Sequence, residues 1–395
     1  MRVLFVAHSF PRRAGDAAGS FLHRLARALI AAGAEVRVVA PSAEGLAPRE
    51  DVDGVPVVRY RYAPRALETL AYTGAMADAV RGSWSGRAAL GGLLASAAFA
   101  VRREVGRWRP DLVHAHWWFP GGTSVVLPGV TGGRPIVLTM HGSDVRLARR
   151  VAPARRAYAA VARRAAAVTA VSHWLCQQAG DMAPNVPCSV LRMPVNTDVF
   201  SPAPDGAPRS GVLFVGRLTK QKGVDALLHA VQSLPSAPTL TIVGSGPEDA
   251  ALRDLARRLG LEDRVRWVPG LQPQSELAAW YRRACVLAVP SEEEGLGLVA
   301  VEAALCGTPT VGFASGGLTD VVSDGQTGRL VALGDRAALS GALRQLLESP
   351  EHAAALGARA RAAAGEFAPA AVAERHLALY AAVTGGRRPS LGRAP

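Results

Sequence analysis

The feature that most constrains the fold is a regular alternation of short apolar runs with amphipathic helical patterns along almost the whole chain. In the first half the expected strands are 2–7, 35–40, 55–60, 112–115, 136–139 and 167–171, with helices at 20–32, after Gly121 and at 147–166. A second series of expected strands covers 212–215, 240–243, 265–268, 286–289, 310–311 and 329–331, again with helices between them. Strands that alternate with helices form parallel sheets, so the sequence predicts an α/β protein.

The length of the chain and a proline-rich segment near its middle predict two domains. A chain of 395 residues is too long for one ordinary core, and the proline-rich, aperiodic segment 193–209 has the composition of a linker. We therefore expect Rossmann-like domains at 1–192 and 210–365, facing each other across a central cleft. A final helix at 366–384 and a disordered tail at 385–395 complete the prediction.

One segment, 290–307, indicates a ligand site and reads P-S-E-E-E-G-L-G-L-V-A-V-E-A-A-L-C-G. Its loop leaves the carboxyl end of an expected buried strand and opens a helix, which is where open α/β sheets bind ligands. Glycines there let backbone N–H groups approach a phosphate or a sugar, and carboxylates accept hydrogen bonds from neighbouring hydroxyls. Glu294 and Glu302 are the expected ligands, whereas Glu292 and Glu293 are expected to be solvated.

The run E-G-L-G-L-V-A-V-E resembles the E-x7-E motif of the family-4 retaining glycosyltransferases, which have the GT-B fold. The resemblance extends over nearly the whole chain. It implies that Glu294 binds the transferred sugar, that Glu302 binds the nucleotide ribose, and that the final helix crosses back onto the first domain. Four residues between the two glutamates are also expected to line the donor: Gly295, Leu296, Gly297 and Leu298.

A basic loop follows the strand at 212–215 and reads G-R-L-T-K-Q-K-G. Arginine as a planar fork and lysine as a point charge are both suited to phosphate oxygens. The loop matches the family pattern G-R-x-x-x-x-K-G, and this resemblance implies that Arg217 and Lys222, beside Gly216, neutralise the leaving diphosphate.

Three further loops of the second half resemble parts of the family. G-S-G-P-E, with Gly244 and Gly246, is similar to a segment that lines the donor cleft, although a lone G-x-G also fits a plain turn. The loop 269–277, with Leu271, resembles the one whose backbone contacts the nucleobase. The segment 316–328 matches G-G-x-x-E-x-V-x-D-G-x-x-G, except that Asp320 replaces the glutamate, which predicts a supporting role for that carboxylate.

In the first half, T-M-H-G-S-D follows the strand at 136–139. A histidine at the carboxyl end of a strand can donate a hydrogen bond to a sugar hydroxyl or a leaving oxygen. The segment is similar to the family's T-x-H-G-x-D, whose histidine lies beside the transferred sugar. The resemblance therefore adds His141 to Arg217, Lys222 and Glu294 as the expected catalytic residues.

Other residues of the first half are candidates for the acceptor and the diphosphate. In D-L-V-H-A-H-W-W-F-P-G-G we expect His114 to pack, and we expect His116 and Trp117, together with Asp144, to line an acceptor cleft. The two histidines have metal-ligand spacing, but no third and fourth ligand accompanies them. The first loop contains separated glycines, of which Gly19 is the expected contact to the diphosphate at a helix N-terminus.

Metal and cofactor are both expected to be absent. The D-V-D run at 51–53 mimics a metal-binding D-x-D motif, but it precedes a glycine and a strand and is interpreted as a turn. By resemblance, GT-B enzymes use basic residues and helix dipoles in place of a cation. The only small molecule expected is the substrate, a nucleotide-diphosphate sugar, with UDP-sugars favoured and GDP-mannose as the alternative.

Charge and cysteine usage bear on partners and compartment. Residues 1–200 hold 25 Lys and Arg against 13 Asp and Glu, a net of +12, whereas the rest of the chain has a net of +1. This asymmetry predicts an acidic partner for the first half, and an arginine-rich face within 146–164 suggests anionic lipid. The four cysteines show no C-x-x-C spacing and the N-terminus shows no signal peptide, so we expect reduced thiols and a cytoplasmic protein, with peripheral contact to the inner face of the plasma membrane as a hypothesis.

These observations predict a retaining, metal-independent hexosyltransferase that uses a hydroxyl acceptor, either a glycan or a lipid-linked one, in polysaccharide or glycolipid biosynthesis. Two alternatives stay open: a nucleotide-sugar 2-epimerase of the same fold, and a catalytically silent nucleotide-sugar-binding protein. A Rossmann dehydrogenase is excluded because no strand–G-x-G-x-x-G–helix unit with a following acidic residue is present.

Overall fold

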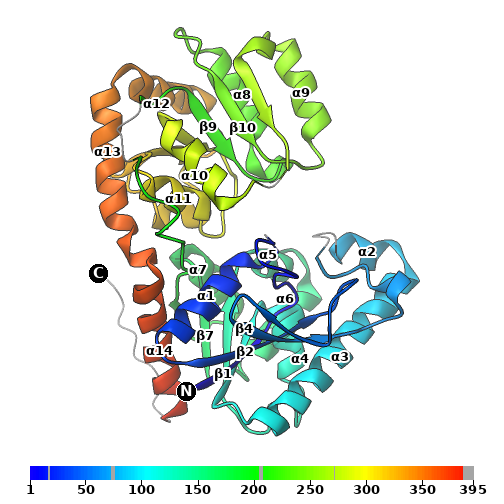
Figure 1. Cartoon of the computed structure of the whole chain (residues 1–395). Helices are drawn as coiled ribbons and strands as arrows, with labels where there is room; N and C mark the ends of the chain where they lie inside the picture. The colour runs from blue at the N-terminus through cyan, green and yellow to red at the C-terminus, as the bar shows by residue number, and fades with distance from the viewer. Residues whose placement is uncertain (17, 73–75, 204–207, 271, 386–395) are drawn as a thin grey trace. The chain divides into compact units, whose positions relative to one another are not determined.

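The structure is a computed structural model that describes residues 1–16, 18–72, 76–203, 208–270 and 272–385. It consists of two compact units, shown in Figure 1. Unit 1 comprises Met1–Pro194 and Pro369–Pro395, and unit 2 comprises Val195–Ala368. Each unit is built on one sheet that is parallel or almost so, which confirms the predicted α/β class with two Rossmann-like domains.

The sheet of unit 1 has the strand order β3-β4-β2-β1-β5-β6-β7-β8, and only β3 runs antiparallel to its neighbour. Its strands are β1 Arg2–Val6, β2 Glu35–Pro41, β3 Arg49–Val52, β4 Val55–Tyr60, β5 Leu112–His116, β6 Ile136–Met140, β7 Ala167–Ala170 and β8 Cys188–Val190. Residues on both faces of β1, β5 and β6 are buried, as expected of strands covered by helices on each side. The D-V-D run lies at the β3–β4 turn, where the Gly54 nitrogen donates to Asp51 Oδ1 at 2.6 Å, so its interpretation as a turn is confirmed.

The helices and helical turns of unit 1 are α1 Ser20–Ala31, η1 Arg65–Leu67, α2 Met76–Gly82, α3 Trp84–Trp108, η2 Trp118–Gly122, α4 Thr123–Val125, α5 Ser143–Arg150, α6 Ala152–Ala162, α7 His173–Met182 and α14 Pro369–Thr384. The helix expected at 147–166 is therefore two helices, because the chain is extended at Val151 and Pro153 lies in the first turn of the second one. The final helix α14 packs against α1, and the Tyr380 hydroxyl lies 2.7 Å from His114 Nδ1 on β5.

The sheet of unit 2 is wholly parallel, with the order β11-β10-β9-β12-β13-β14. Its strands are β9 Val212–Val215, β10 Leu240–Val243, β11 Val265–Val268, β12 Val286–Val289, β13 Thr310–Phe313 and β14 Gly328–Val331. Its helices and turns are η3 Lys220–Lys222, α8 Val224–Gln232, α9 Asp249–Arg258, η4 Glu262–Arg264, α10 Gln274–Arg283, α11 Leu298–Leu305, η5 Gly316–Asp320, α12 Arg336–Glu348, α13 Pro350–Ala363 and η6 Ala364–Phe367. Helix α8 packs against α9 and α12, and α10 packs against α11.

The expected linker at 193–209 is largely part of unit 2, which begins at Val195. Phe200 is 1% exposed, and the Arg282 guanidinium donates to the Val199 and Ser201 carbonyl oxygens at 2.9 and 2.6 Å. Proline content alone predicted a free linker, but a buried aromatic ring and a partly buried arginine fix this segment to α10. The second boundary also shifts, because unit 2 ends at Ala368 and the expected break at 365 lies inside η6.

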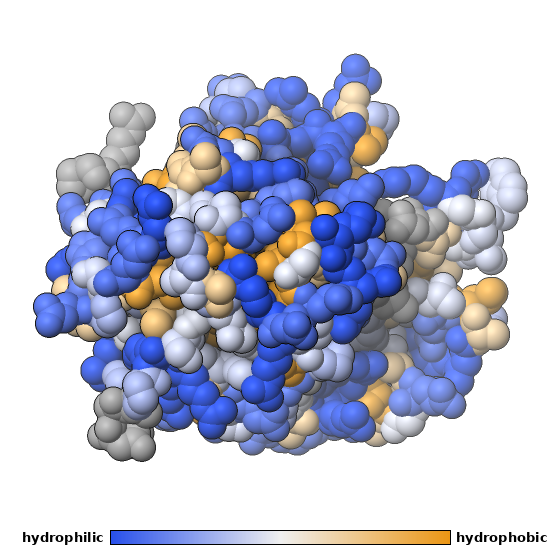
Figure 2. Space-filling view, turned by 90° about the horizontal axis from the view of Figure 1, so that it is seen from above, coloured by the Kyte–Doolittle hydropathy of each residue, from blue (hydrophilic) through white to orange (hydrophobic). Residues whose placement is uncertain are grey.

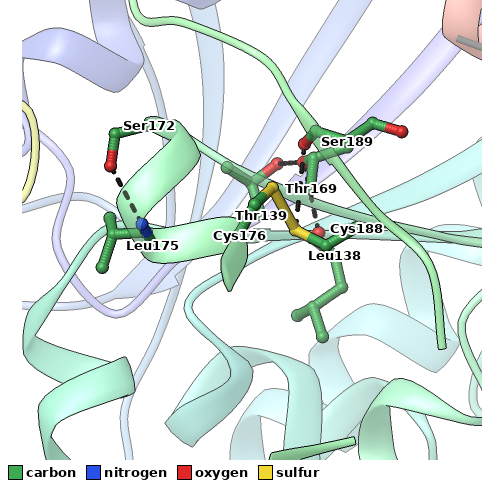
Figure 3. Close-up of a disulfide and its surroundings, with 8 residues drawn as sticks. All are labelled: Leu138, Thr139, Thr169, Ser172, Leu175, Cys176, Cys188 and Ser189. Carbon is green, nitrogen blue, oxygen red and sulfur yellow. Dashed lines mark hydrogen bonds between the residues drawn. A yellow bond between two sulfur atoms is a disulfide. The ribbon is translucent and has the colours of Figure 1, made fainter. Parts of the chain in front are cut away.

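The expectation of four reduced thiols is wrong for two of them. Cys176 on α7 and Cys188 on β8 form a disulfide, with their Cα atoms 5.3 Å apart, as Figure 3 shows. Cys285 and Cys306 are free. The spacing of 12 residues did not predict this disulfide. The two sulfurs meet only because β8 pairs with β7 and α7 packs against β8.

The visible surface in Figure 2 is mostly hydrophilic, with apolar residues in separate patches. None of the helices that the structure describes is long and apolar enough to span a bilayer. The apolar segment 88–101 forms the middle of α3.

Candidate functional site

The candidate site of unit 2 lies where the strand order of its sheet reverses. From β9 the chain proceeds to β10 and β11 on one side, whereas β12, β13 and β14 follow on the other side of β9. The loops after β9 and β12 therefore leave neighbouring strands and diverge, which creates the crevice where parallel sheets bind ligands. These two loops are the ones that carry the G-R-x-x-x-x-K-G and E-x7-E motifs.

The structure brings two of the expected catalytic residues together at this point. Lys222 in η3 donates through Nζ to both carboxylate oxygens of Glu294, at 3.0 and 2.7 Å. The two side chains are 23% and 12% exposed, so the pair is sheltered but reachable from solvent. A ligand with phosphate and hydroxyl groups can divide this pair, because the ammonium donates to phosphate oxygens and the carboxylate accepts from hydroxyls.

Glycines hold the loops around this ion pair in close contact. A side chain on Gly316 would come within 2.6 Å of the Glu294 backbone nitrogen, and the Gly317 nitrogen donates to the Glu294 carbonyl oxygen at 2.7 Å. A side chain on Gly223, which precedes α8 with a φ of 64°, would collide with the backbone of Pro290. The Gly316–Gly317 pair therefore packs directly against the backbone of Glu294 and holds it in position.

Arg217, also expected to be catalytic, is exposed, and its guanidinium makes no hydrogen bond or ion pair with any residue in the described part of the chain. The loop after β10 fixes its position, because the Leu218 nitrogen donates to the Ser245 carbonyl oxygen at 3.0 Å. A side chain on Gly246 would come within 2.6 Å of that same Leu218 nitrogen. A side chain on Gly244 would collide with Gly216, so in this structure both glycines of the G-x-G loop pack against the loop of Arg217.

The segment that follows Glu294 opens helix α11. Gly297 precedes the helix with a φ of 83°, and no side chain caps the helix N-terminus within the described residues. Leu296 is 5% exposed and anchors the loop, while Leu298 begins the helix. The first N–H groups of a helix lack intrahelical acceptors and favour an anion, so this end suits a phosphate or a sugar oxygen.

Glu302 lies on α11 and is 9% exposed. The Tyr281 hydroxyl on α10 donates to its Oε2 at 2.9 Å. Burial, followed by the negative charge of Glu302, raises the pKa of Tyr281 well above its ordinary value, so this hydroxyl stays a donor. One side of the Glu302 carboxylate is thus oriented by a buried phenol.

Two contributors to this site escaped sequence analysis. Tyr281 gave no signal, because a tyrosine on the buried face of α10 looks like a core residue until α10 packs on α11. Gln221 occupies a variable position of its motif, yet its side chain donates to the Glu293 carbonyl oxygen and its own carbonyl accepts from the Glu292 nitrogen at 2.9 Å. The expected nucleobase contact Leu271 lies outside the described residues.

Unit 1 has a corresponding reversal of strand order between β1 and β5, and its expected site residues lie around it. His141 follows β6 and its Nε2 lies 3.2 Å from His116 Nδ1. Burial, and next the neighbouring His8, lowers the pKa of His141 to about 3, so its imidazole is neutral near pH 7. A neutral imidazole can exchange hydrogen bonds with a hydroxyl, but it does not supply a positive charge.

The three residues expected to line an acceptor cleft are buried within unit 1. His116, Trp117 and Asp144 are 0%, 7% and 3% exposed. The Asp144 carboxylate accepts hydrogen bonds from the backbone nitrogens of Trp118, His141 and Gly142 at 3.0–3.1 Å, so it ties the loop after β5 to the loop after β6. Burial raises the pKa of Asp144, and these backbone donors oppose the rise.

His114 packs as expected, between the Tyr380 hydroxyl and Thr139 Oγ1 at 2.7 and 2.6 Å. Gly19 precedes α1 with a φ of 69°, and a side chain there would come within 2.9 Å of the Phe10 Cα. Its lack of a side chain therefore serves packing within the first loop. Within the described ranges, no group of three or more His, Cys, Asp or Glu side chains is arranged so that it could hold a metal ion.

The fold and these motif-bearing loops define the class of the protein as a glycosyltransferase with the GT-B fold. Two family descriptions match the chain: a glycosyl transferase 4-like domain over residues 17–193 and glycosyl transferases group 1 over residues 206–363. The chain belongs to the group 1 glycosyltransferases.

Its curated relatives include enzymes with different acceptors. The glycogen synthase of Mycobacterium tuberculosis is 31% identical over 433 residues, which cover 100% of this chain and 98% of the relative. The D-inositol 3-phosphate glycosyltransferase of Thermobispora bispora is 34% identical over 331 residues, which cover 74% of this chain and 76% of the relative.

Solved structures show the same fold at low sequence identity. Sucrose-phosphate synthase from Thermosynechococcus elongatus aligns with a TM-score of 0.82 and 23% identity over 98% of this chain and 99% of that one. HepE from Anabaena, in complex with UDP and glucose, aligns with a TM-score of 0.75 and 20% identity over 97% of this chain and 100% of that one.

Proposed function

We propose that this protein transfers a hexose-type sugar from a nucleotide-diphosphate sugar to a hydroxyl acceptor, with retention of configuration and without a metal ion. The observation that carries the proposal is the Lys222–Glu294 ion pair at the strand reversal of unit 2, with Arg217 exposed beside it. A cation, a carboxylate and an uncapped helix start within neighbouring loops match the groups of a sugar diphosphate.

The chemistry follows from these residues. As the bond between the sugar C1 and the phosphate oxygen breaks, Lys222 and Arg217 stabilise the negative charge that develops on the diphosphate. Glu294 accepts hydrogen bonds from the sugar, and Glu302, oriented by Tyr281, accepts them from the ribose. The acceptor oxygen bonds to C1 on the same face, and its proton passes to the departing phosphate oxygen. His141 takes part in the proposal through the family resemblance alone.

The donor is proposed to be a UDP-sugar, with GDP-mannose as the alternative, and no further cofactor is required. The fold neighbour HepE, whose structure contains UDP and glucose, supports UDP. A role in polysaccharide or glycolipid assembly is one proposal for the acceptor, and the names of the relatives add glucan and D-inositol 3-phosphate to the compounds worth testing.

Contact with an anionic membrane from the cytoplasmic side is a further part of the proposal. Among the arginines of segment 146–164 that suggested it, Arg146 is half-buried and the others are exposed: Arg149, Arg150, Arg155, Arg156, Arg163 and Arg164. A cytoplasmic location also requires that the Cys176–Cys188 disulfide form in a compartment where glutathione keeps most thiols reduced.

A donor screen tests the proposed activity. Purified protein is incubated with UDP-, GDP- and ADP-sugars, with and without glucan or D-inositol 3-phosphate, and nucleotide release and sugar products are measured. Nucleotide release from one donor class, accelerated by an acceptor, is the expected result. Conversion of the donor to its 2-epimer without nucleotide release would identify an epimerase, and binding without turnover would identify a silent binding protein.

A further inference from the structure

A groove of about 720 Å³ lies in unit 1 between α3 and the edge hairpin β3–β4. Its size is that of a small-molecule site, since ligand pockets commonly measure about 300–1,000 Å³. Val58 and Ala95 give it apolar walls, and Arg49, Arg61 and Arg103 stand among its lining residues. None of these residues belongs to the motifs of the transferase site, so the groove needs a separate explanation.

The groove carries more positive charge than its own carboxylate can neutralise. Its one acidic lining residue, Glu104, has a side chain 1% exposed and already accepts from both Arg37 and Arg49. The Arg103 guanidinium is exposed and has no hydrogen bond or ion pair with another described residue. Arg61 donates to the Ala63 carbonyl oxygen at 3.3 Å and lies 3.7 Å from Glu68, but half of its side chain is exposed and the ion pair is weak. An anion is therefore the complementary ligand.

A tyrosine hydroxyl is also available in the same groove. Tyr60 lines the groove, and within the described part of the chain its hydroxyl makes no hydrogen bond. A phenol hydroxyl can donate a hydrogen bond to a phosphate oxygen, so Tyr60 adds a neutral donor to the arginines. This donor is independent of the arginines and indicates the same kind of ligand.

The outward face of α3 extends the groove with apolar side chains. Trp84 is 81% exposed and Phe99, which lines the groove, is 68% exposed. The only acidic residue of this 25-residue helix is the buried Glu104. Its exposed charges are all arginines: Arg87, Arg102, Arg103 and Arg107. Exposed aromatic rings beside arginines, without exposed carboxylates, are typical of helices that lie in a membrane interface.

We propose that the groove and the outward face of α3 bind the surface of a membrane that contains anionic phospholipid. Arg61, Arg103 and the Tyr60 hydroxyl hold a lipid phosphate, and Trp84 and Phe99 enter the layer between headgroups and acyl chains. This inference rests on the membrane contact of the proposed function and assigns that contact to a defined surface of unit 1. At the α5–α6 arginines, by comparison, Arg155 donates to the Asp181 carbonyl oxygen and Arg149 lies over the Trp174 ring.

Vesicle flotation with matched charge reversals tests this assignment. The full-length protein is floated with phosphatidylcholine vesicles that contain or lack phosphatidylglycerol, at low salt. The variant Arg61→Glu/Arg103→Glu is compared with Arg149→Glu/Arg155→Glu, which reverses the same number of charges on α5 and α6. We expect wild type and the α5–α6 variant to bind only the anionic vesicles, and we expect the groove variant to bind at least about tenfold more weakly.

Two further variants separate the parts of the surface. Trp84→Ala/Phe99→Ala keeps every charge and should lower vesicle binding several-fold, and Tyr60→Phe should lower it two- to fivefold. Thermal melting checks that each variant is folded. UDP binding is a second check, because the proposed UDP site contains none of the altered residues. The control also keeps the lipid result distinct from a failure of the proposed transferase function, since UDP binding is read separately.

Three outcomes would overturn the proposal. Wild type that stays with the unbound fraction on anionic vesicles would remove the membrane contact, and equal losses for the two double reversals would remove its assignment to α3. Saturation of the groove by inorganic phosphate or glycerol phosphate alone, with no added affinity from vesicles, would show that the ligand is a free phosphate compound.

Discussion

In both units the strand order of the sheet reverses between two central strands, and a ligand site is expected at their carboxyl ends. The side chains found there differ between the two units. In unit 2 the place between β9 and β12 holds charged, partly exposed side chains, namely Arg217 and the Lys222–Glu294 pair. In unit 1 the place between β1 and β5 holds buried neutral rings, with His114 and His116 both 0% exposed.

The difference follows from what surrounds each pair of loops. In unit 2, glycines bring neighbouring backbones together and leave the ionised side chains at the surface of the loops. In unit 1, Phe5 lies 5.3 and 4.7 Å from the rings of His114 and His116, and α14 adds His376 and Tyr380 to the same cluster. Similar topology therefore does not predict similar function. The charged loops of unit 2 are suited to phosphate chemistry. The neutral rings of unit 1 pack among themselves and against α14.

Removal of Lys222 is the strongest test of this contrast. We expect Lys222→Ala to lower the rate of sugar transfer by about 10²–10³-fold, because one preorganised donor to the developing charge is lost. Steady-state kinetics with the preferred donor measure the effect. Lys220→Ala, in the same turn but exposed, is the control and should keep near-normal activity. Equal losses in the two variants would mean that general positive charge matters and the ion pair does not.

Glu302 and Tyr281 give the next largest effect. Glu302→Ala should weaken nucleotide binding by about 1–3 kcal/mol, because a buried polar partner of the ribose is lost. Tyr281→Phe should weaken it less, and it should also reduce the preference for UDP over its 2′- and 3′-deoxy analogues, since only the orientation of the carboxylate is lost. Calorimetry measures both. Unchanged nucleotide affinity in Glu302→Ala would contradict the ribose assignment.

The neutral cluster of unit 1 predicts a dependence of stability on acid. Burial lowers the pKa of His376 to about 4 and that of His8 to about 4, so the unfolded chain binds protons more readily than the folded one as pH falls below 6.5. Stability is fully present above pH 6.5 and is lost progressively as pH falls toward 4, by about 1.4 kcal/mol per pH unit for each proton.

Denaturant unfolding between pH 8 and pH 4.5 measures this loss. In His376→Leu the pH dependence should be shallower by up to one proton, because that ring is 0% exposed and its Nδ1 bonds only within its own helix, to the Val372 carbonyl oxygen. Measurement at pH 8, where the histidines are neutral in both states, separates the cost of altered packing. Parallel pH profiles for wild type and variant would show that the cluster does not titrate on unfolding.

The smallest expected effect is that of a chelator. In the proposed mechanism the cations of unit 2 stabilise the charge that develops on the diphosphate. Sugar transfer should therefore continue in EDTA at an undiminished rate. Loss of turnover that manganese or magnesium restores would show that a metal ion does part of this work, and the histidines of unit 1 would then need reconsideration as ligands.

Much of the fold could be predicted from the sequence, and the reasons are local. Strands such as 286–289 and 212–215 were found because a run buried on both faces is continuously apolar. The predictions failed where they relied on amino-acid composition and the structure depended on side-chain packing. Prolines suggested a free linker at 193–209, although Phe200 and Arg282 fix much of it to unit 2. Local sequence also gave no indication that the Asp144 carboxylate accepts hydrogen bonds from the backbone of two loops.

The sequence by itself determined the alternation of strands and helices, the glycine positions of the loops and the residue types of both motifs, because periodicity and backbone preference depend on near neighbours. Only the tertiary structure decided which loops meet. Lys222 and Glu294 are 72 positions apart and become partners because β12 inserts beside β9. The Tyr281–Glu302 hydrogen bond and the Cys176–Cys188 disulfide likewise depend on how helices and strands pack, and side chains brought together in that way leave no mark in the local sequence.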